Sequence, residues 1–117
     1  MIAVPPQATI FVAIKSIDFR NGINGISRIC RQKLRSDPMS GAIFVFRNRL
    51  KTTLKILFYD GEAFWLLTRR LSRGKIKWWP TSTRGHCELD AKKLQTIIMN
   101  GNPESAEFSD DWKKLIR

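Results

Sequence analysis

The chain has 117 residues, of which 21 are Lys or Arg and 10 are Asp or Glu, so its formal net charge is +11. A hydrophobic fraction of 43% fits one globular core, and neither low-complexity sequence nor a long apolar span occurs, which excludes disordered, fibrous and membrane-spanning classes. A short chain with this charge is expected to meet a polyanion.

The first apolar run, residues 8–14, is short and ends at Lys15, so no secretory signal is expected. We therefore predict a cytoplasmic protein without membrane contact, nucleoid-associated if the polyanion is DNA. Cys30 and Cys87 lack disulfide or metal-site spacing, and His86 beside Cys87 completes no ligand set. Reduced thiols, no metal and no cofactor are expected.

The predicted elements begin with a β-branched and aromatic strand over residues 9–14. A helix follows near residues 21–35, and Asp37-Pro38 ends it. Its apolar stripe of Ile23, Ile26, Cys30 and Leu34 is expected to face the core. Four strands are then predicted at 42–47, 54–59, 63–70 and 75–79. Asp60-Gly61 predicts a tight hairpin turn in which both residues have positive φ.

A loop is predicted over residues 81–86, followed by a second helix that Asp90 caps and whose core stripe is Leu94, Ile97 and Ile98. The fold class is thus α+β: a mostly antiparallel sheet of about five strands, the first strand plus a four-stranded meander, with two packed helices. Several strands are apolar on both faces, so one face needs a helix and the other a helix, partner or ligand. This domain spans residues 1–102, and residues 103–117 form an acidic tail or short helix.

The positive charge is concentrated in residues 1–87, which hold 16 Lys or Arg and 4 Asp or Glu, whereas residues 88–117 hold 5 and 6. In a meander the first and third turns lie at the same end of the sheet, and both turns are basic here. Phosphate contact by these side chains is the leading interpretation, and solvated surface positions are the alternative. The candidate DNA-contact residues are Arg28, Arg31, Arg35, Arg47, Arg49, Lys51, Arg69, Arg70, Arg73, Lys75 and Lys77.

Four aromatic residues leave two interpretations open, because Tyr59, Trp65, Trp78 and Trp79 can stack on unpaired bases or pack in the core. Catalysis is not expected, since a metal-dependent nuclease needs about three gathered carboxylates. In the basic region Asp18 alone lies outside an obvious turn, so a nuclease requires Asp18, Asp37 and another carboxylate to meet.

Short motifs in a fixed order resemble the TnpB-type accessory protein of the insertion sequence 66 group. They run from Asp18-Phe19-Arg20-Asn21-Gly22-Ile23-Asn24-Gly25 through Asp37-Pro38 and Phe44-Val45-Phe46-Arg47-Asn48-Arg49 to Trp79-Pro80, and the resemblance covers about residues 1–101. The motif residues that shape turns are Asp18, Arg20, Gly22, Gly25, Asp37, Pro38, Gly41, Asp60, Gly61, Gly74 and Pro80. Whether Asp18 and Arg20 hold a turn or act functionally is left open.

The resemblance implies an accessory role in transposition, with a separate transposase that performs the strand chemistry as partner. We therefore expect a non-catalytic protein that binds DNA at element ends through the basic turns, or assists the transposase, or does both. The alternative is a protein–protein adaptor or homodimer module without direct DNA contact, whose second apolar sheet face covers its partner.

Overall fold

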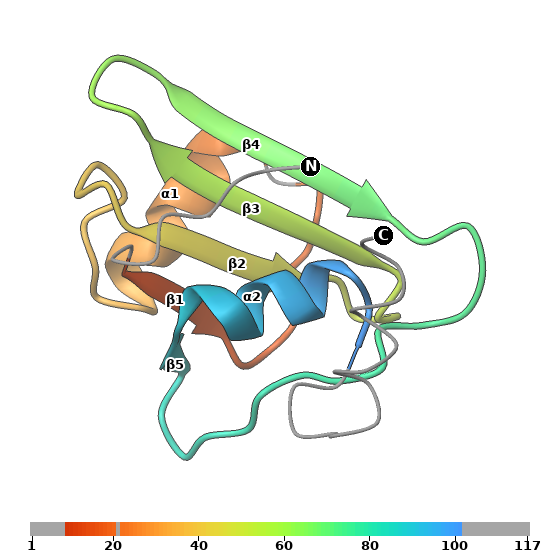
Figure 1. Cartoon of the computed structure of the whole chain (residues 1–117). Helices are drawn as coiled ribbons and strands as arrows, with labels where there is room; N and C mark the ends of the chain where they lie inside the picture. The colour runs from red at the N-terminus through yellow and green to blue at the C-terminus, as the bar shows by residue number, and fades with distance from the viewer. Residues whose placement is uncertain (1–8, 21, 102–117) are drawn as a thin grey trace.

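The structure, a computed structural model, describes residues 9–20 and 22–101, and Figure 1 shows a sheet crossed by helices. The predicted tail at 103–117 lies outside the described residues. The described elements in chain order are β1 (Ile10–Ala13), α1 (Ile23–Gln32), β2 (Ile43–Arg47), β3 (Thr53–Tyr59), β4 (Phe64–Arg70), β5 (His86–Leu89) and α2 (Ala91–Ile98).

The five strands follow the order β4-β3-β2-β1-β5, and the sheet is mixed. β1 and β2 run parallel, with Phe11 beside Phe44, while the other neighbouring pairs are antiparallel. The α+β class is confirmed, but the prediction of a mostly antiparallel sheet is wrong. The reason is the connection through α1: a crossover helix returns the chain so that the next strand runs in the same direction as the first.

The meander has three strands, β2, β3 and β4, and the predicted fourth strand at 75–79 is a loop. This loop packs on the core: Ile76 donates its backbone N–H to the Lys51 carbonyl (2.7 Å), and Trp79 Nε1 donates to the Ala13 carbonyl (2.9 Å). The fifth strand is instead β5, which begins at the end of the predicted 81–86 loop and pairs with β1.

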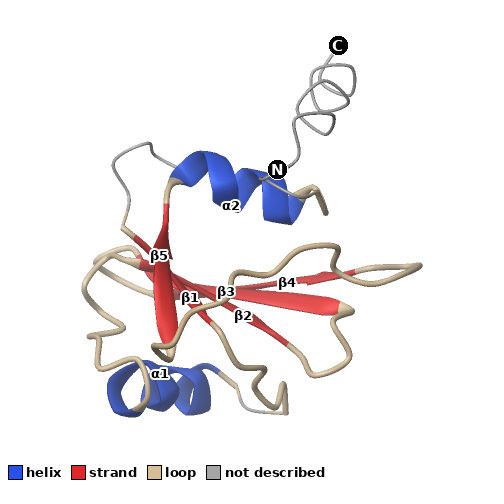
Figure 2. Cartoon of the chain, turned by 90° about the horizontal axis from the view of Figure 1, so that it is seen from below, coloured by secondary structure: helices blue, strands red, loops and turns tan. Residues whose placement is uncertain are grey.

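Each face of the sheet carries one helix, as Figure 2 shows. On one face, Ile26, Cys30 and Leu34 of the α1 region pack against the buried rings of Phe44 and Phe46. On the other face, α2 buries a second apolar cluster that contains Val12, Val45, Leu94 and Ile97. The prediction that both faces need cover is confirmed. The cover on the second face is α2, not the partner surface that the adaptor hypothesis requires there.

Two local predictions differ in outcome. Asp90 caps α2, because its Oδ1 accepts the Lys93 backbone N–H at 2.7 Å. The β3–β4 hairpin forms as predicted, but its turn is shifted by one residue. The Asp60 N–H donates to the Ala63 carbonyl (3.0 Å), so the central residues are Gly61 and Glu62, and of the two predicted residues only Gly61 has positive φ, +100°. No helix among the described residues is long and apolar enough to cross a membrane.

Candidate nucleic-acid interface

Two basic loops lie side by side at one end of the sheet. The β2–β3 turn spans residues 48–52, and residues 71–76 follow β4, whose last residue Arg70 pairs with Thr53 at the start of β3. Backbone hydrogen bonds join the loops: Leu71 N–H donates to Thr52 O (2.9 Å) and Ile76 N–H to Lys51 O (2.7 Å). We call residues 47–52 and 69–77, the two loops with their strand ends, the basic rim.

The basic rim holds eight cations and no carboxylate. Its cations are Arg47, Arg49, Lys51, Arg69, Arg70, Arg73, Lys75 and Lys77, and all except Arg47 are exposed. The opposite end of the meander is the acidic β3–β4 turn, which carries Asp60 and Glu62. The strand directions therefore separate opposite charges to opposite ends of the sheet.

Asn48 fixes the shape of the β2–β3 turn. Its Oδ1 accepts the backbone N–H groups of Thr52 (2.9 Å) and Thr53 (3.1 Å), and its Nδ2 donates to Thr52 Oγ1 (2.8 Å). Asparagine and aspartate commonly close turns in this way, because their short polar side chains reach nearby backbone donors. Lys51 sits in the left-handed region at φ +59°. The turn thus presents Arg49 and Lys51 from a hydrogen-bonded backbone.

The second loop is tied to the end of α2. Asn100 Oδ1 accepts the Lys77 backbone N–H at 2.9 Å, and Asn100 Nδ2 donates to the Lys75 carbonyl at 3.3 Å. Gly74, at φ +70°, supplies the left-handed residue in this loop, where a side chain is strained. Asn100, more than twenty positions further along the chain, therefore fixes the backbone at Lys75 and Lys77.

Arg47 differs from the other rim cations because it belongs to the packing. It is half-buried, its Nη1 donates to the Asn48 carbonyl (3.1 Å), and its guanidinium lies 5.8 Å from the centre of the Trp79 ring. Trp79 is in turn fixed on Ala13. A cation over an aromatic face is stabilised by the ring quadrupole. Arg47 supports the rim from beneath.

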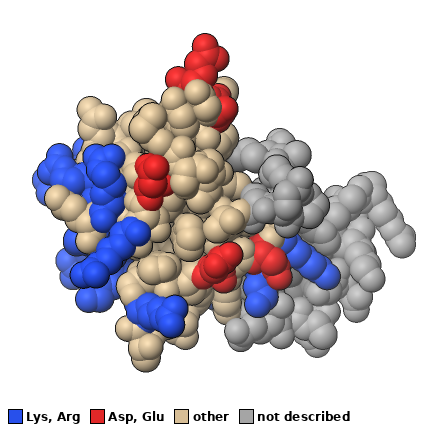
Figure 3. All heavy atoms as spheres, turned by 90° about the vertical axis from the view of Figure 1, so that its left-hand side faces the viewer, with Lys and Arg blue, Asp and Glu red and all other residues tan. Residues whose placement is uncertain are grey.

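The cations of the α1 region form a second basic surface. α1 begins near β3, where Lys55 Nζ donates to the Phe19 carbonyl (3.3 Å), and its far end lies near Gly85. Figure 3 views the molecule from the left-hand side of Figure 1 and shows Lys and Arg gathered there. The rim loops lie on the opposite side, at the right of Figure 1. The structure does not bring these cations to the rim. They are Arg28, Arg31, Lys33 and Arg35, all exposed.

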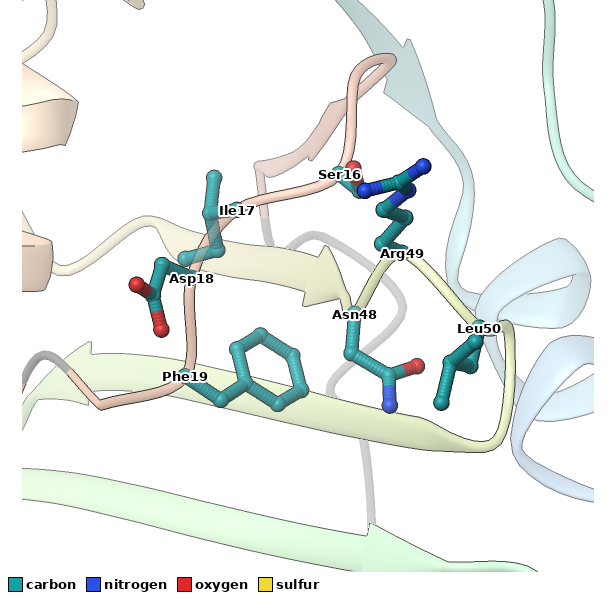
Figure 4. A pocket seen from close by; sticks show the side chains of 7 residues that line it. All are labelled: Ser16, Ile17, Asp18, Phe19, Asn48, Arg49 and Leu50. Atoms are coloured by element: carbon teal, nitrogen blue, oxygen red, sulfur yellow. The ribbon is translucent and has the colours of Figure 1, made fainter.

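A groove of about 400 Å³ borders the basic rim. Its walls are the β1–α1 connection and the β2–β3 turn; Figure 4 shows the Arg49 side chain near Ser16 and the Phe19 ring directed toward Asn48. The lining residues are Ser16, Ile17, Asp18, Phe19, Asn48, Arg49 and Leu50. Sequence reasoning missed this groove, although two of the quoted family motifs meet in it.

Asp18 and Arg20 contact each other at the edge of this groove. Asp18 Oδ1 accepts the Arg20 backbone N–H (2.9 Å), and Oδ2 accepts Nε (2.9 Å) and Nη2 (2.6 Å) of the same residue. These hydrogen bonds from Arg20 lower the pKa of the Asp18 carboxyl below its ordinary value. The contact spans two residues, so it shapes the connection into α1.

The other motif residues lie in α1 and in several separate loops. Asp37 Oδ1 accepts the Met39 N–H (2.9 Å) between α1 and β2, and Gly22 precedes α1. The prolines at 38 and 80 are buried, Gly25 lies in α1, and Gly41 and Gly61 have positive φ. Within residues 9–20 and 22–101, no three His, Cys, Asp or Glu side chains gather to hold a metal ion.

The four aromatic candidates are divided between the core and the far end of the sheet. Trp78 and Trp79 pack against the α2-side cluster. Tyr59 ends β3 and Trp65 is near the start of β4, so both lie away from the basic rim. Trp65 is 50% exposed, stacks on Phe58 and donates its Nε1 to Asp60 Oδ2 (2.8 Å). Tyr59 and Trp65 therefore cannot stack on bases that contact the rim.

Comparison with known proteins gives one family and two similar chains. The family model described as IS66 Orf2 like protein matches residues 8–107. Two proteins of Sinorhizobium fredii (strain NBRC 101917 / NGR234) are similar: uncharacterized protein y4hO is 29% identical over 98 residues, 84% of each chain, and uncharacterized protein y4jC is 38% identical over 76 residues, 65% of each chain. No solved structure matches.

Proposed function

Because the chain belongs to the IS66 Orf2-like family of transposition-associated accessory proteins, we propose that it binds DNA through the basic rim and thereby assists transposition. The observation that carries this proposal is the convergence of two hydrogen-bonded loops whose fifteen residues hold eight cations and no carboxylate. A transposition-associated protein acts on DNA, so we expect the DNA phosphate backbone to be the polyanion that these cations contact.

The geometry of the rim supports phosphate contact more than base readout. Its exposed cations extend from turn backbones and a strand end, and the described rim includes no helix of the kind that enters the major groove. Each phosphate neutralised by Lys or Arg contributes about 0.9 to the slope of log affinity against log salt concentration. Contact by four to six of the seven exposed rim cations thus gives a slope of roughly −4 to −5.

The test is fluorescence anisotropy with a labelled DNA duplex over a salt series. The rim variant Arg73→Glu/Lys75→Glu is compared with Lys92→Glu/Lys93→Glu, which changes the net charge equally at the exposed start of α2. We expect the rim variant to weaken binding at least tenfold and to flatten the salt slope by about 2, while the α2 variant has a small effect. Equal losses in both variants would contradict a localised interface.

We further propose that the transposase is the protein partner and that the chain itself is non-catalytic. The exposed Leu50, 66% accessible at the tip of the β2–β3 turn, offers an apolar contact among the rim cations. Co-purification of the transposase after nuclease treatment, lost on Leu50→Asp but not on Met39→Asp, is the expected result; Met39 is a similarly exposed apolar residue outside the rim. Magnesium-dependent DNA cleavage that Asp18→Ala abolishes would overturn the non-catalytic assignment.

A further inference from the structure

β4 is the edge strand of the sheet, and its outer side has no partner among the described residues. The hydrogen-bond pattern shows which groups face outward. Asp60 N–H donates to Ala63 O, and Leu71 N–H donates to Thr52 O, so residues 63 and 71 face β3. Antiparallel hydrogen-bonded pairs alternate along a strand. The backbone N–H and C=O groups of Phe64, Leu66, Thr68 and Arg70 therefore point away from the sheet.

We propose that β4 pairs antiparallel with β4 of a second copy of this chain, with Leu67 opposite Leu67 at the two-fold axis. In this register the outward residues meet one another: position 64 faces 70, and position 66 faces 68. Each such pair exchanges two hydrogen bonds, so every outward group of the seven-residue strand is satisfied. A shift by two residues leaves an outward residue at one end of each strand without a partner.

The side chains of β4 are complementary to their own two-fold image. The strand begins with the aromatic Phe64 and Trp65 and ends with the basic Arg69 and Arg70. In the proposed register Trp65 of one copy lies opposite Arg69 of the other, and Phe64 lies opposite Arg70. Directly opposite residues share a face of the sheet, and a guanidinium against an aromatic ring is a favourable pair.

The loops beyond the strand ends carry matching charges. The β3–β4 turn before the strand is acidic, with Asp60 and Glu62, and the loop after it is basic, with Arg73 and Lys75. Antiparallel pairing brings the acidic turn of each copy beside the basic loop of the other. Trp65, half-exposed in the single chain, then gains a neighbour on its open side. These features identify a second copy of this chain as the occupant of the edge.

The pairing leads to a testable disulfide prediction. Residues opposite each other in a non-hydrogen-bonded antiparallel pair have Cα atoms about 4.5 Å apart, a separation that a disulfide spans. Leu67→Cys therefore forms an intermolecular disulfide under mild oxidation. Thr68→Cys does not, because position 68 faces position 66 of the other copy. The parent chain, whose Cys30 is buried and Cys87 half-buried, is the background control.

The association itself is measured by light scattering coupled to size exclusion on nuclease-treated protein. A mass near 27 kDa, twice that of the 13.5 kDa chain, is expected at high concentration. Arg69→Glu/Arg70→Glu removes both cation–aromatic pairs on each side of the two-fold and weakens dimerisation roughly tenfold or more. The charge-matched Lys92→Glu/Lys93→Glu leaves it unchanged. A monomer at all concentrations, or crosslinking through position 68 instead of 67, would overturn the proposal. In a monomer, Arg69 and Arg70 would instead be charged residues that keep the exposed edge strand from pairing with other chains.

Discussion

Removal of the Asn48 side chain tests how the basic rim is built. In Asn48→Ala the Thr52 and Thr53 backbone N–H groups lose their shared acceptor, and Thr52 Oγ1 loses its donor. Thr53 is buried at the start of β3, so water does not readily replace the lost bond. A net hydrogen bond contributes about 1 kcal/mol and an unsatisfied buried group costs roughly 1–3 kcal/mol, so the free energy of unfolding falls by about 2–4 kcal/mol.

Thermal unfolding followed by circular dichroism measures this loss. For a domain of this size roughly 4 °C corresponds to 1 kcal/mol, so Tm falls by about 8–16 °C. Asn48→Asp is the matched control, because it keeps the Oδ1 acceptor and replaces the Nδ2 donor with a carboxylate oxygen whose negative charge lies among cations. We expect it to lose less than half as much stability as Asn48→Ala.

The same variants connect stability with DNA binding. Asn48→Ala leaves every rim cation in place but frees the backbone that presents Arg49 and Lys51, so affinity falls without a change in net charge. Measurements are made well below the Tm of the variant. A Tm within about 2 °C of the parent, or an unchanged DNA affinity in a destabilised variant, would refute the reasoning that Asn48 organises the turn.

Three further predictions concern single residues. Burial raises the pKa of the Cys30 thiol to about 12, so Cys30 resists alkylation at pH 8 in the folded protein and reacts only on unfolding, while the half-buried Cys87 reacts first; equal rates in the native state would contradict this packing. Hydrogen bonds from the Ala63 N–H, then from the Trp65 indole and the Glu62 N–H, lower the pKa of the Asp60 carboxyl. The ionised carboxylate therefore stabilises the folded state above about pH 3.8, and this stabilisation is lost as pH falls through the lower folded-state pKa. An NMR titration of Asp60 with a midpoint above 3.8 would contradict these hydrogen bonds. Gly74→Ala costs about 1–2 kcal/mol because φ is +70°. Gly85→Ala is the near-neutral control, because Gly85 lies outside the positive-φ region and an added Cβ meets only the Lys33 carbonyl at 3.8 Å; urea unfolding of the two variants measures the difference.

The sequence predicts the elements that obey a clear period or cap. Of the predicted stripe, Ile26, Cys30 and Leu34 are buried against the sheet, whereas Ile23 at the start of α1 is exposed. Asp90 caps α2 as predicted. The convergence of the two basic loops also follows from strand direction, since successive antiparallel strands return each second connection to the same end. These features depend on local chemistry and on order along the chain, which a single sequence contains.

The strand errors arise where tertiary contacts decide the structure. Residues 75–79 have a composition typical of a strand. Their backbone groups instead form hydrogen bonds with the Asn100 side chain and the Lys51 carbonyl, so this segment does not pair with a strand. β5 contains the polar His86 and Glu88 and lacks a strand signal, yet pairing with β1 satisfies its backbone. Long-range partners override propensity in both segments.

The groove next to the rim was not predictable for a related reason. Phe19 and Arg49 lie thirty residues apart, in two connections that sequence patterns describe only as turns. Their approach depends on the Ile17 N–H bond to the Arg47 carbonyl (3.0 Å), a contact between two irregular segments. Candidate site residues can therefore be named from charge, while the surface that they form requires the fold.

If the rim binds DNA as proposed, the hydrogen bonds from Asn100 to the 75–77 loop link that binding thermodynamically to the docking of α2. A ligand that binds only the docked form stabilises it by RT ln(1 + [L]/Kd), so bound DNA protects the α2 backbone amides from hydrogen exchange. The linkage also orders events during synthesis. Since the loop is held by a residue about 25 positions downstream, the rim reaches its final shape only after residue 100 has left the ribosome. A nascent chain therefore acquires its interface after its sheet.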